Sequence, residues 1–125
     1  MAISYSSSAS GQFVGVSSTR TLSMTTNAGD TRLIAGIFTN SGSGFSATFN
    51  GDAMTAVTSH TNGSYTMYVF ELRNPDIGTF DITFNWTGNI NGDMVAASYQ
   101  GDATAVAISN FAGASAATVN ITAVT

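Results

Sequence analysis

The chain contains no cysteine and no lysine, and it has few charged residues of any kind. The absence of cysteine excludes disulfide bonds and thiolate metal sites. Charged residues make up 8% of the 125 residues, whereas soluble domains average about 25%. Three arginines and seven acidic residues give a net charge of −4. Because cations this sparse cannot neutralise a row of phosphates, we expect neither nucleic acid nor an anionic membrane as a partner.

Long apolar runs and helical periodicity are also lacking. No stretch approaches the roughly 18 apolar residues of a membrane helix, and no window repeats its apolar residues at helical spacing. The first residues have neither the basic start nor the apolar run of a signal peptide. We therefore expect a protein that is made in the cytoplasm of a host cell. Hydrophobic residues still account for 43% of the chain, which is typical of a folded domain rather than a disordered one.

The sequence does contain repeated alternation of apolar and polar residues, the pattern of half-buried strands. In residues 79–86, Phe80, Ile82, Phe84 and Trp86 face one way, and polar residues face the other. Residues 32–38 and 65–72 are apolar on both faces, which predicts two central strands. Turn residues separate these segments, and Asn-Gly pairs at 50–51, 62–63 and 91–92 predict tight hairpins.

These patterns predict an all-β fold, a two-sheet antiparallel β-sandwich of jelly-roll or Ig-like type with about eight to ten short strands. We expect one domain over residues 1–125. Residues 11–18 are predicted to form a loop. Residues 103–125 are predicted to form a C-terminal strand segment that contacts a partner. The expected strands are approximately residues 3–9, 20–26, 31–39, 45–49, 53–60, 65–73, 79–87, 93–100, 104–109 and 117–124.

Few residues suit catalysis or metal binding. His60 is the single histidine, and no Gly-x-Ser-x-Gly motif is present. Glu71 is the single glutamate and lies two residues from Arg73 on the same strand face, so we expect either an ion pair between them or an exposed edge position. Four aspartates follow glycines in turns, where closing the turn is a simpler role than binding calcium; they are Asp30, Asp52, Asp93 and Asp102. We therefore expect no enzyme activity, no catalytic residue, no metal and no cofactor.

The aromatic residues allow two interpretations. Trp86 continues the inward row of its strand, so we expect it to pack in the core. Alternatively Trp86, Tyr65, Tyr68 or Tyr99 stacks against a sugar ring, as in carbohydrate-binding modules.

An ordered series of turn motifs over roughly residues 19–102 resembles a known module. The series comprises Thr-Leu-Ser-Met at 21–24, Ala-Gly-Asp-Thr-Arg-Leu at 28–33, Asn-Gly-Asp-Ala-Met-Thr at 50–55, Asn-Pro-Asp-Ile-Gly-Thr at 74–79 and Tyr-Gln-Gly at 99–101. It resembles a β-sandwich module of tailed-phage virion proteins that also occurs in some bacterial surface proteins. The resemblance implies a non-enzymatic role on the virion, such as capsid decoration (cement), a head fibre or a tail appendage.

Our first expectation is therefore a capsid decoration or cement protein that stabilises the phage head. It would lie on the surface of the phage particle and bind the major capsid protein or another virion protein. We expect a homo-oligomer, with a trimer favoured. The apolar residues Phe13, Val14 and Val16 are the expected partner contacts. The alternative is a carbohydrate-binding or adhesin module of a tail fibre or a bacterial surface protein.

Overall fold

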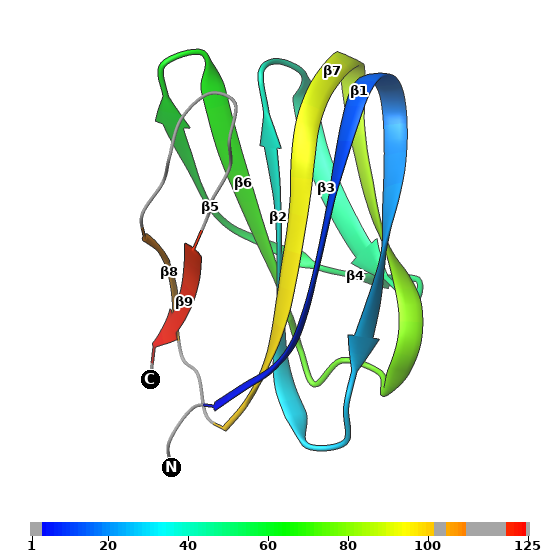
Figure 1. The fold of residues 1–125 in the computed structure, drawn as a ribbon, viewed down its shortest axis with the longest axis vertical. Coiled ribbons are helices and arrows are strands. Elements are labelled where there is room, and N and C mark those ends of the chain that lie inside the picture. The colour runs from blue at the N-terminus through cyan, green and yellow to red at the C-terminus, as the bar shows by residue number, and fades with distance from the viewer. Residues whose placement is uncertain (1–3, 102–104, 110–119, 125) are drawn as a thin grey trace.

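A computed structural model describes residues 4–101, 105–109 and 120–124 of the chain. These residues form antiparallel β-strands and no helix (Figure 1), so the all-β prediction is confirmed. The described part therefore contains no helix that is long and apolar enough to span a membrane. The strands are β1 (Ser4–Thr26), β2 (Asp30–Thr39), β3 (Ser43–Phe49), β4 (Asp52–Ala53), β5 (Thr55–Asn62), β6 (Tyr65–Arg73), β7 (Gly78–Gln100), β8 (Ala105–Ser109) and β9 (Asn120–Val124).

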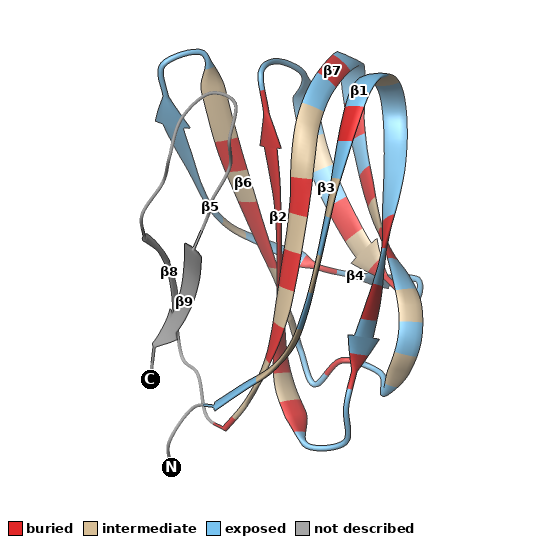
Figure 2. Ribbon diagram, in the orientation of Figure 1, coloured by how far each residue is buried: buried red, intermediate tan, exposed pale blue. Residues whose placement is uncertain are grey.

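Seven of these strands belong to one sheet. Its order is β4-β3-β7-β2-β6-β5, with β1 paired to β7 off this path, while β8 and β9 form a separate two-stranded sheet. β2 and β6 are interior strands, as their two apolar faces predict. β2 is buried along nearly its whole length (Figure 2).

The prediction of eight to ten short strands is wrong for the main sheet, because two of its strands are long. β1 and β7 each span 23 residues and pair with each other along their length. The segment 11–18, predicted to be a loop, lies inside β1. Two predicted strands, 79–87 and 93–100, are joined in β7, so the hairpin predicted at Asn91-Gly92 does not form.

The hairpin predicted at Asn50-Gly51 is confirmed. A hairpin also forms at the second Asn-Gly pair, but its two turn residues are Gly63 and Ser64 rather than Asn62 and Gly63. Asn50 and Gly51 both have positive φ angles, 50° and 84°, and join β3 to β4. This is the backbone of a type I′ turn, which Asn-Gly favours. Between β5 and β6, Asn62 pairs with Tyr65 and Gly63 has a φ angle of 64°. The single proline lies in the turn between β6 and β7, where it costs no ladder hydrogen bond.

The length of β7 lets it contribute to two halves of the sheet. Its first half pairs with β3, where Ile82 lies opposite Phe49, and its second half pairs with β2, where Ala97 lies opposite Ile34. The sheet therefore curls over the core and is nearly barrel-shaped (Figure 1). The predicted two-sheet sandwich is not confirmed by this single curled sheet.

Buried apolar residues form two clusters on opposite faces of the sheet. The larger cluster fills the inside and draws residues from both halves, including Leu33, Phe49, Phe70 and Phe84. The smaller cluster consists of Ile34, Phe38, Met67 and Val69. Ile34 and Leu33 are neighbours in one strand, so they point to opposite faces. The smaller cluster therefore lies on the outer face of β2 and β6.

Candidate functional site

An open cavity of about 260 Å³ lies where β1 and β7 pass between the two halves of the sheet. Residues 12–14 of β1 and 91–93 of β7 form one wall, and Phe38 of β2 and Tyr65 of β6 form the other. A second cavity of about 220 Å³ also has Gln12 and Asp93 in its lining. These two polar residues are therefore accessible from two neighbouring hollows.

An irregularity in the β1–β7 pairing places the β1 residues of the site. Gln12 lies opposite Asp93 and Phe13 opposite Gly92, and the register then shifts before Val16. Gly15 has a φ angle of 61° within this shift, a conformation that glycine adopts at little cost. Its N–H donates a 2.7 Å hydrogen bond to Oδ1 of Asn91. The bulged strand is thus held against β7 while Val14 projects outwards.

Asn91 is fixed from a second side by the turn after β2. Its backbone N–H donates to Oδ1 of Asn40 at 3.1 Å, and its carbonyl accepts from the Asn40 N–H at 3.4 Å. Both of these bonds tie β7 to the end of β2. Because the Asn91 side chain and backbone are both engaged, its position at the rim of the cavity is well defined.

Aromatic rings form two walls of the cavity. Phe38 and Tyr65 are stacked with their centroids 5.2 Å apart and their planes 9° from parallel. Phe13 stacks on Trp86 at 5.4 Å, and Trp86 donates its indole N–H to the Gly88 carbonyl at 2.9 Å. Phe13 and Trp86 are each 5% exposed. The wall that contains Phe13 is therefore part of the core. Tyr65 is the aromatic residue of the cavity that remains partly accessible.

Asp93 is the acidic group of the site. Burial raises the pKa of this carboxyl, and a hydrogen bond from the Gln12 side chain opposes the rise in part. A partly buried carboxyl beside amides and an aromatic ring can hydrogen-bond a small polar ligand and pack against its apolar face. Among the residues that the structure describes, no three histidine or acidic side chains gather where a metal ion could bind.

The three predicted partner contacts lie in very different surroundings. Phe13 is buried in the main cluster, Val16 is half-buried against it, and Val14 is 82% exposed. Sequence reasoning placed all three in a loop, whereas they belong to a bulged strand whose residues alternate between the two faces. Val14 is thus the residue of the three whose surface is available to a partner.

The aspartates of the predicted turns are now placed, except for Asp102, which lies outside the described residues. Asp30 closes the turn before β2: its Oδ2 accepts a 2.9 Å bond from the Asn27 N–H, and its Oδ1 accepts one from Gln100. Burial acts to raise the pKa of Asp30, but hydrogen bonds, the one from Asn27 foremost, outweigh it and lower the pKa. Asp52 is exposed on β4, and Asp93 lies inside β7 rather than in a turn.

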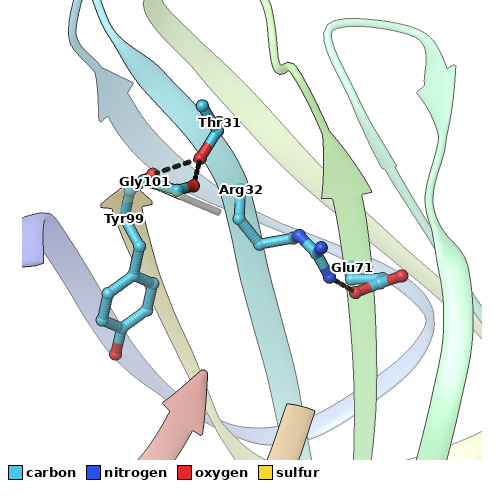
Figure 3. Close-up of polar contacts among 5 residues, drawn as sticks. All are labelled: Thr31, Arg32, Glu71, Tyr99 and Gly101. Carbon is cyan, nitrogen blue, oxygen red and sulfur yellow. Dashed lines mark hydrogen bonds and ion pairs between the residues drawn. The ribbon is translucent and has the colours of Figure 1, made fainter. Parts of the chain in front are cut away.

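Glu71 pairs with Arg32 of the neighbouring strand (Figure 3), so the ion pair with Arg73, one of the two expected roles, is wrong. Arg73 is exposed, whereas the Arg32 side chain is 3% exposed. The cross-strand partner could not be predicted from spacing along one strand, because it depends on the register of β2 against β6. At the same end of β2, Thr31 donates hydrogen bonds to the carbonyls of Tyr99 and Gly101.

The sequence suggests Tyr65 as a stacking residue, and it suggests Asp93 only as a calcium ligand or a turn residue. It gives no signal for Gln12, since a lone glutamine in a polar segment carries none. Comparison of the chain with protein-family models, with curated proteins and with solved structures finds no match in any of the three.

Proposed function

We propose that this chain is a non-enzymatic structural protein of a tailed-phage virion, a capsid decoration or cement protein that stabilises the head. It acts as a homo-oligomer, with a trimer favoured, on the surface of the particle. It binds the major capsid protein or another virion protein, and needs no cofactor. The virion assignment is supported by the order of turn motifs over residues 19–102. The assembly is supported by the surface of β1.

The observation that carries the proposal is the long outer edge of β1. Within the described residues, β1 pairs with β7 on one side and with no strand on the other. Proteins usually protect such an edge with lysine, proline, other charges or bulges. β1 has no lysine or proline and a single charged residue, Arg20. Its register shifts leave two regular stretches, residues 7–13 and 19–26. The Ser7 hydroxyl donates a hydrogen bond to the Thr25 carbonyl, so a further strand could pair with residues 8–13 and 19–24.

An exposed apolar side chain lies beside this edge. Val14 is 82% exposed, and its side chain stands at the bend between the two regular stretches of β1. A closed ring of three copies needs a head-to-tail contact between two different surfaces. The outer edge of β5 is such a second surface, since β5 ends the path of the main sheet. Backbone pairing between β1 and β5 of the next copy, with Val14 buried beside it, accounts for a trimer.

We also propose that the two halves of the curled sheet pack face to face as the two layers of a β-sandwich of jelly-roll or Ig-like type. Aromatic rings from the two halves contact each other across the core. Phe45 of β3 stacks on Tyr68 of β6 at 4.3 Å, and Phe70 of β6 meets Phe84 of β7 edge-on at 6.3 Å. Such contacts across the core support the two-layer arrangement.

The contact is tested by replacing Val14 with serine and measuring assembly by analytical ultracentrifugation. Val14→Ser should raise the dissociation constant of the oligomer at least tenfold while leaving the fold unchanged. Ala28→Ser is the matched control, because Ala28 is an exposed apolar residue in the turn between β1 and β2. Equal assembly of both variants would remove Val14 from the interface. Co-sedimentation of the chain with expanded tailed-phage heads, with and without Val14→Ser, then tests the virion role.

The alternative function is a carbohydrate-binding or adhesin module. It is favoured by the cavity at Tyr65, where a partly accessible ring lies near Asp93, Gln12 and Asn91. The burial of Trp86 argues against a platform built on that residue. Screening the chain on a glycan array, with Tyr65→Ala as the control for any signal, separates the two functions. Binding that Tyr65→Ala abolishes would favour the adhesin.

A further inference from the structure

The outer face of the sheet carries an apolar strip that is already covered. Its core is the second cluster, Ile34 and Phe38 of β2 with Met67 and Val69 of β6. Val95 and Tyr99 of β7 pack against it. The strip is bounded by polar residues of the two outer strands, Thr58 and His60 on β5 and Ser8 and Ser10 on β1. It is therefore about three strands wide.

The burial in this strip is more complete than an open sheet face allows. Ile34, Met67 and Val69 are each 0% exposed. Met67 extends over Gly36, where an added Cβ would lie 2.1 Å from its Cε, so part of its burial is local. Flat neighbours within one sheet cannot remove all solvent from Ile34 and Val69, because side chains stand perpendicular to the sheet. The Arg32 side chain at the end of the strip is also 3% exposed.

None of the strands in residues 4–101 lies over this strip. β2, β5, β6 and the second half of β7 form the sheet beneath it, and β3 and β4 belong to the half on the other side of the core. The strands left in the described chain are β8 and β9. Figure 1 draws this pair on the side of β2 and β6 that faces away from β3 and β4.

The pairing of β8 with β9 brings the two isoleucines of these strands to opposing register positions. Val106 lies opposite Ala123, and Ile108 lies opposite Ile121. Residues two apart in a strand share a face, so these four positions fall on the same side. The alternate positions hold the pairs Ala105 with Val124, Ala107 with Thr122 and Ser109 with Asn120, which include smaller apolar and polar residues. An isolated two-stranded sheet is at best marginally stable in water, so it requires an apolar surface to pack on.

We propose that the β8–β9 hairpin docks in cis on the outer strip of β2, β6 and β7 and acts as a strap that closes this face. The strip lacks a cover among residues 4–101, and the hairpin lacks a core of its own. Each supplies what the other needs, and one covalent chain joins them. This inference concerns the folding of a single copy and does not depend on the proposed virion role.

The strap is tested with thiol reporters in the full-length chain, which has no cysteine of its own. Val69→Cys reports on the strip, and Ala35→Cys reports on the inner core, where Ala35 is 0% exposed. Thr58→Cys is the exposed reference. Each reporter is combined with the unaltered hairpin and with Ile108→Asp plus Ile121→Asp, and its labelling by a maleimide dye is timed.

We expect the Val69→Cys thiol to be protected in the unaltered hairpin and to react at least tenfold faster in the double-aspartate chain. The Ala35→Cys thiol should stay protected in both, which shows that the domain remains folded. Labelling of Val69→Cys as fast as Thr58→Cys with the unaltered hairpin would overturn the proposal. So would unchanged protection after the hairpin substitutions. Protection that disappears on dilution would show that a second copy provides the cover, which also contradicts docking in cis.

Discussion

Gly92 lies so close to the backbone of Phe38 that a Cβ added to it would stand 2.4 Å from the Phe38 carbonyl oxygen. The ring of Phe13 would be 3.0 Å away on another side. Gly92 is thus required for the close approach of β7 to β2 beside the cavity, and not for a turn.

Replacing Gly92 with alanine should destabilise the fold by about 1–3 kcal/mol, the usual cost of forcing an extra group into a packed site. The free energy of unfolding in urea measures it. Gly11→Ala is the control, because its Cβ would meet only side-chain atoms, at 3.5 and 3.6 Å, which is ordinary contact. Equal stability of the two variants would mean that the strands separate easily at this point.

Phe13 and Val14 are adjacent, but their substitution should change the free energy of unfolding by very different amounts. Phe13→Ser removes a buried ring that stacks on Trp86 and should cost about 3–5 kcal/mol of unfolding free energy. Val14→Ser alters an exposed residue and should change it by no more than about 0.5 kcal/mol. Thermal unfolding of the two variants at equal concentration, under conditions that keep both monomeric, compares them. A strongly destabilised Val14→Ser monomer would contradict the exposure of that side chain.

The carboxyl of Asp93 gives the fold a defined pH dependence. Since burial raises its pKa in the folded state, the folded chain binds more protons than the unfolded chain between the two pKa values. The contribution of this group to stability therefore falls as pH rises through that window and stays lower above it. Asp93→Asn should be more stable than the parent at pH 7, and the difference should shrink below pH 4. Urea unfolding from pH 3 to pH 7 tests this, and a pH-independent difference would refute it.

The ion pair of Arg32 and Glu71 should matter more than any exposed charge. Glu71→Gln leaves the buried Arg32 guanidinium without its counter-charge and should cost about 3 kcal/mol, the lower end for a broken buried pair, because Glu71 is partly exposed. Asp81→Asn makes the same chemical change at an exposed position of β7 and should be nearly neutral. Denaturant unfolding of both variants at pH 7 measures the contrast. Similar small effects would show that Arg32 is solvated.

Much of the fold follows from periodicity, and the errors arise at glycines. The two-faced patterns of residues 32–38 and 65–72 correctly predict interior strands, and the Asn-Gly pair at 50–51 correctly predicts a hairpin. The same pair at 91–92 is in mid-strand, because Gly92 gives space to a neighbouring backbone. Local sequence does not distinguish a glycine needed for its φ angle from one needed for its lack of a side chain.

The sequence patterns do not predict the cavity, for a related reason. Gln12, Phe38, Tyr65 and Asp93 come from four strands, and the register of β1, β2 and β6 around β7 brings them together. Alternation along one strand predicts which face a residue occupies, but not which residue lies across from it. The sequence does not predict the burial of Phe13, because its pattern indicates a loop over residues 11–18.

The central claim is that copies of this chain assemble through β1, and the molar mass in solution tests it most directly. Light scattering during size-exclusion chromatography of the full chain should give a closed oligomer, with three times the 12.8 kDa chain mass favoured. Val14→Asp, which places a charge beside the open edge, should return the mass to that of one chain. A mass of one chain at every concentration of the unaltered protein would contradict the account.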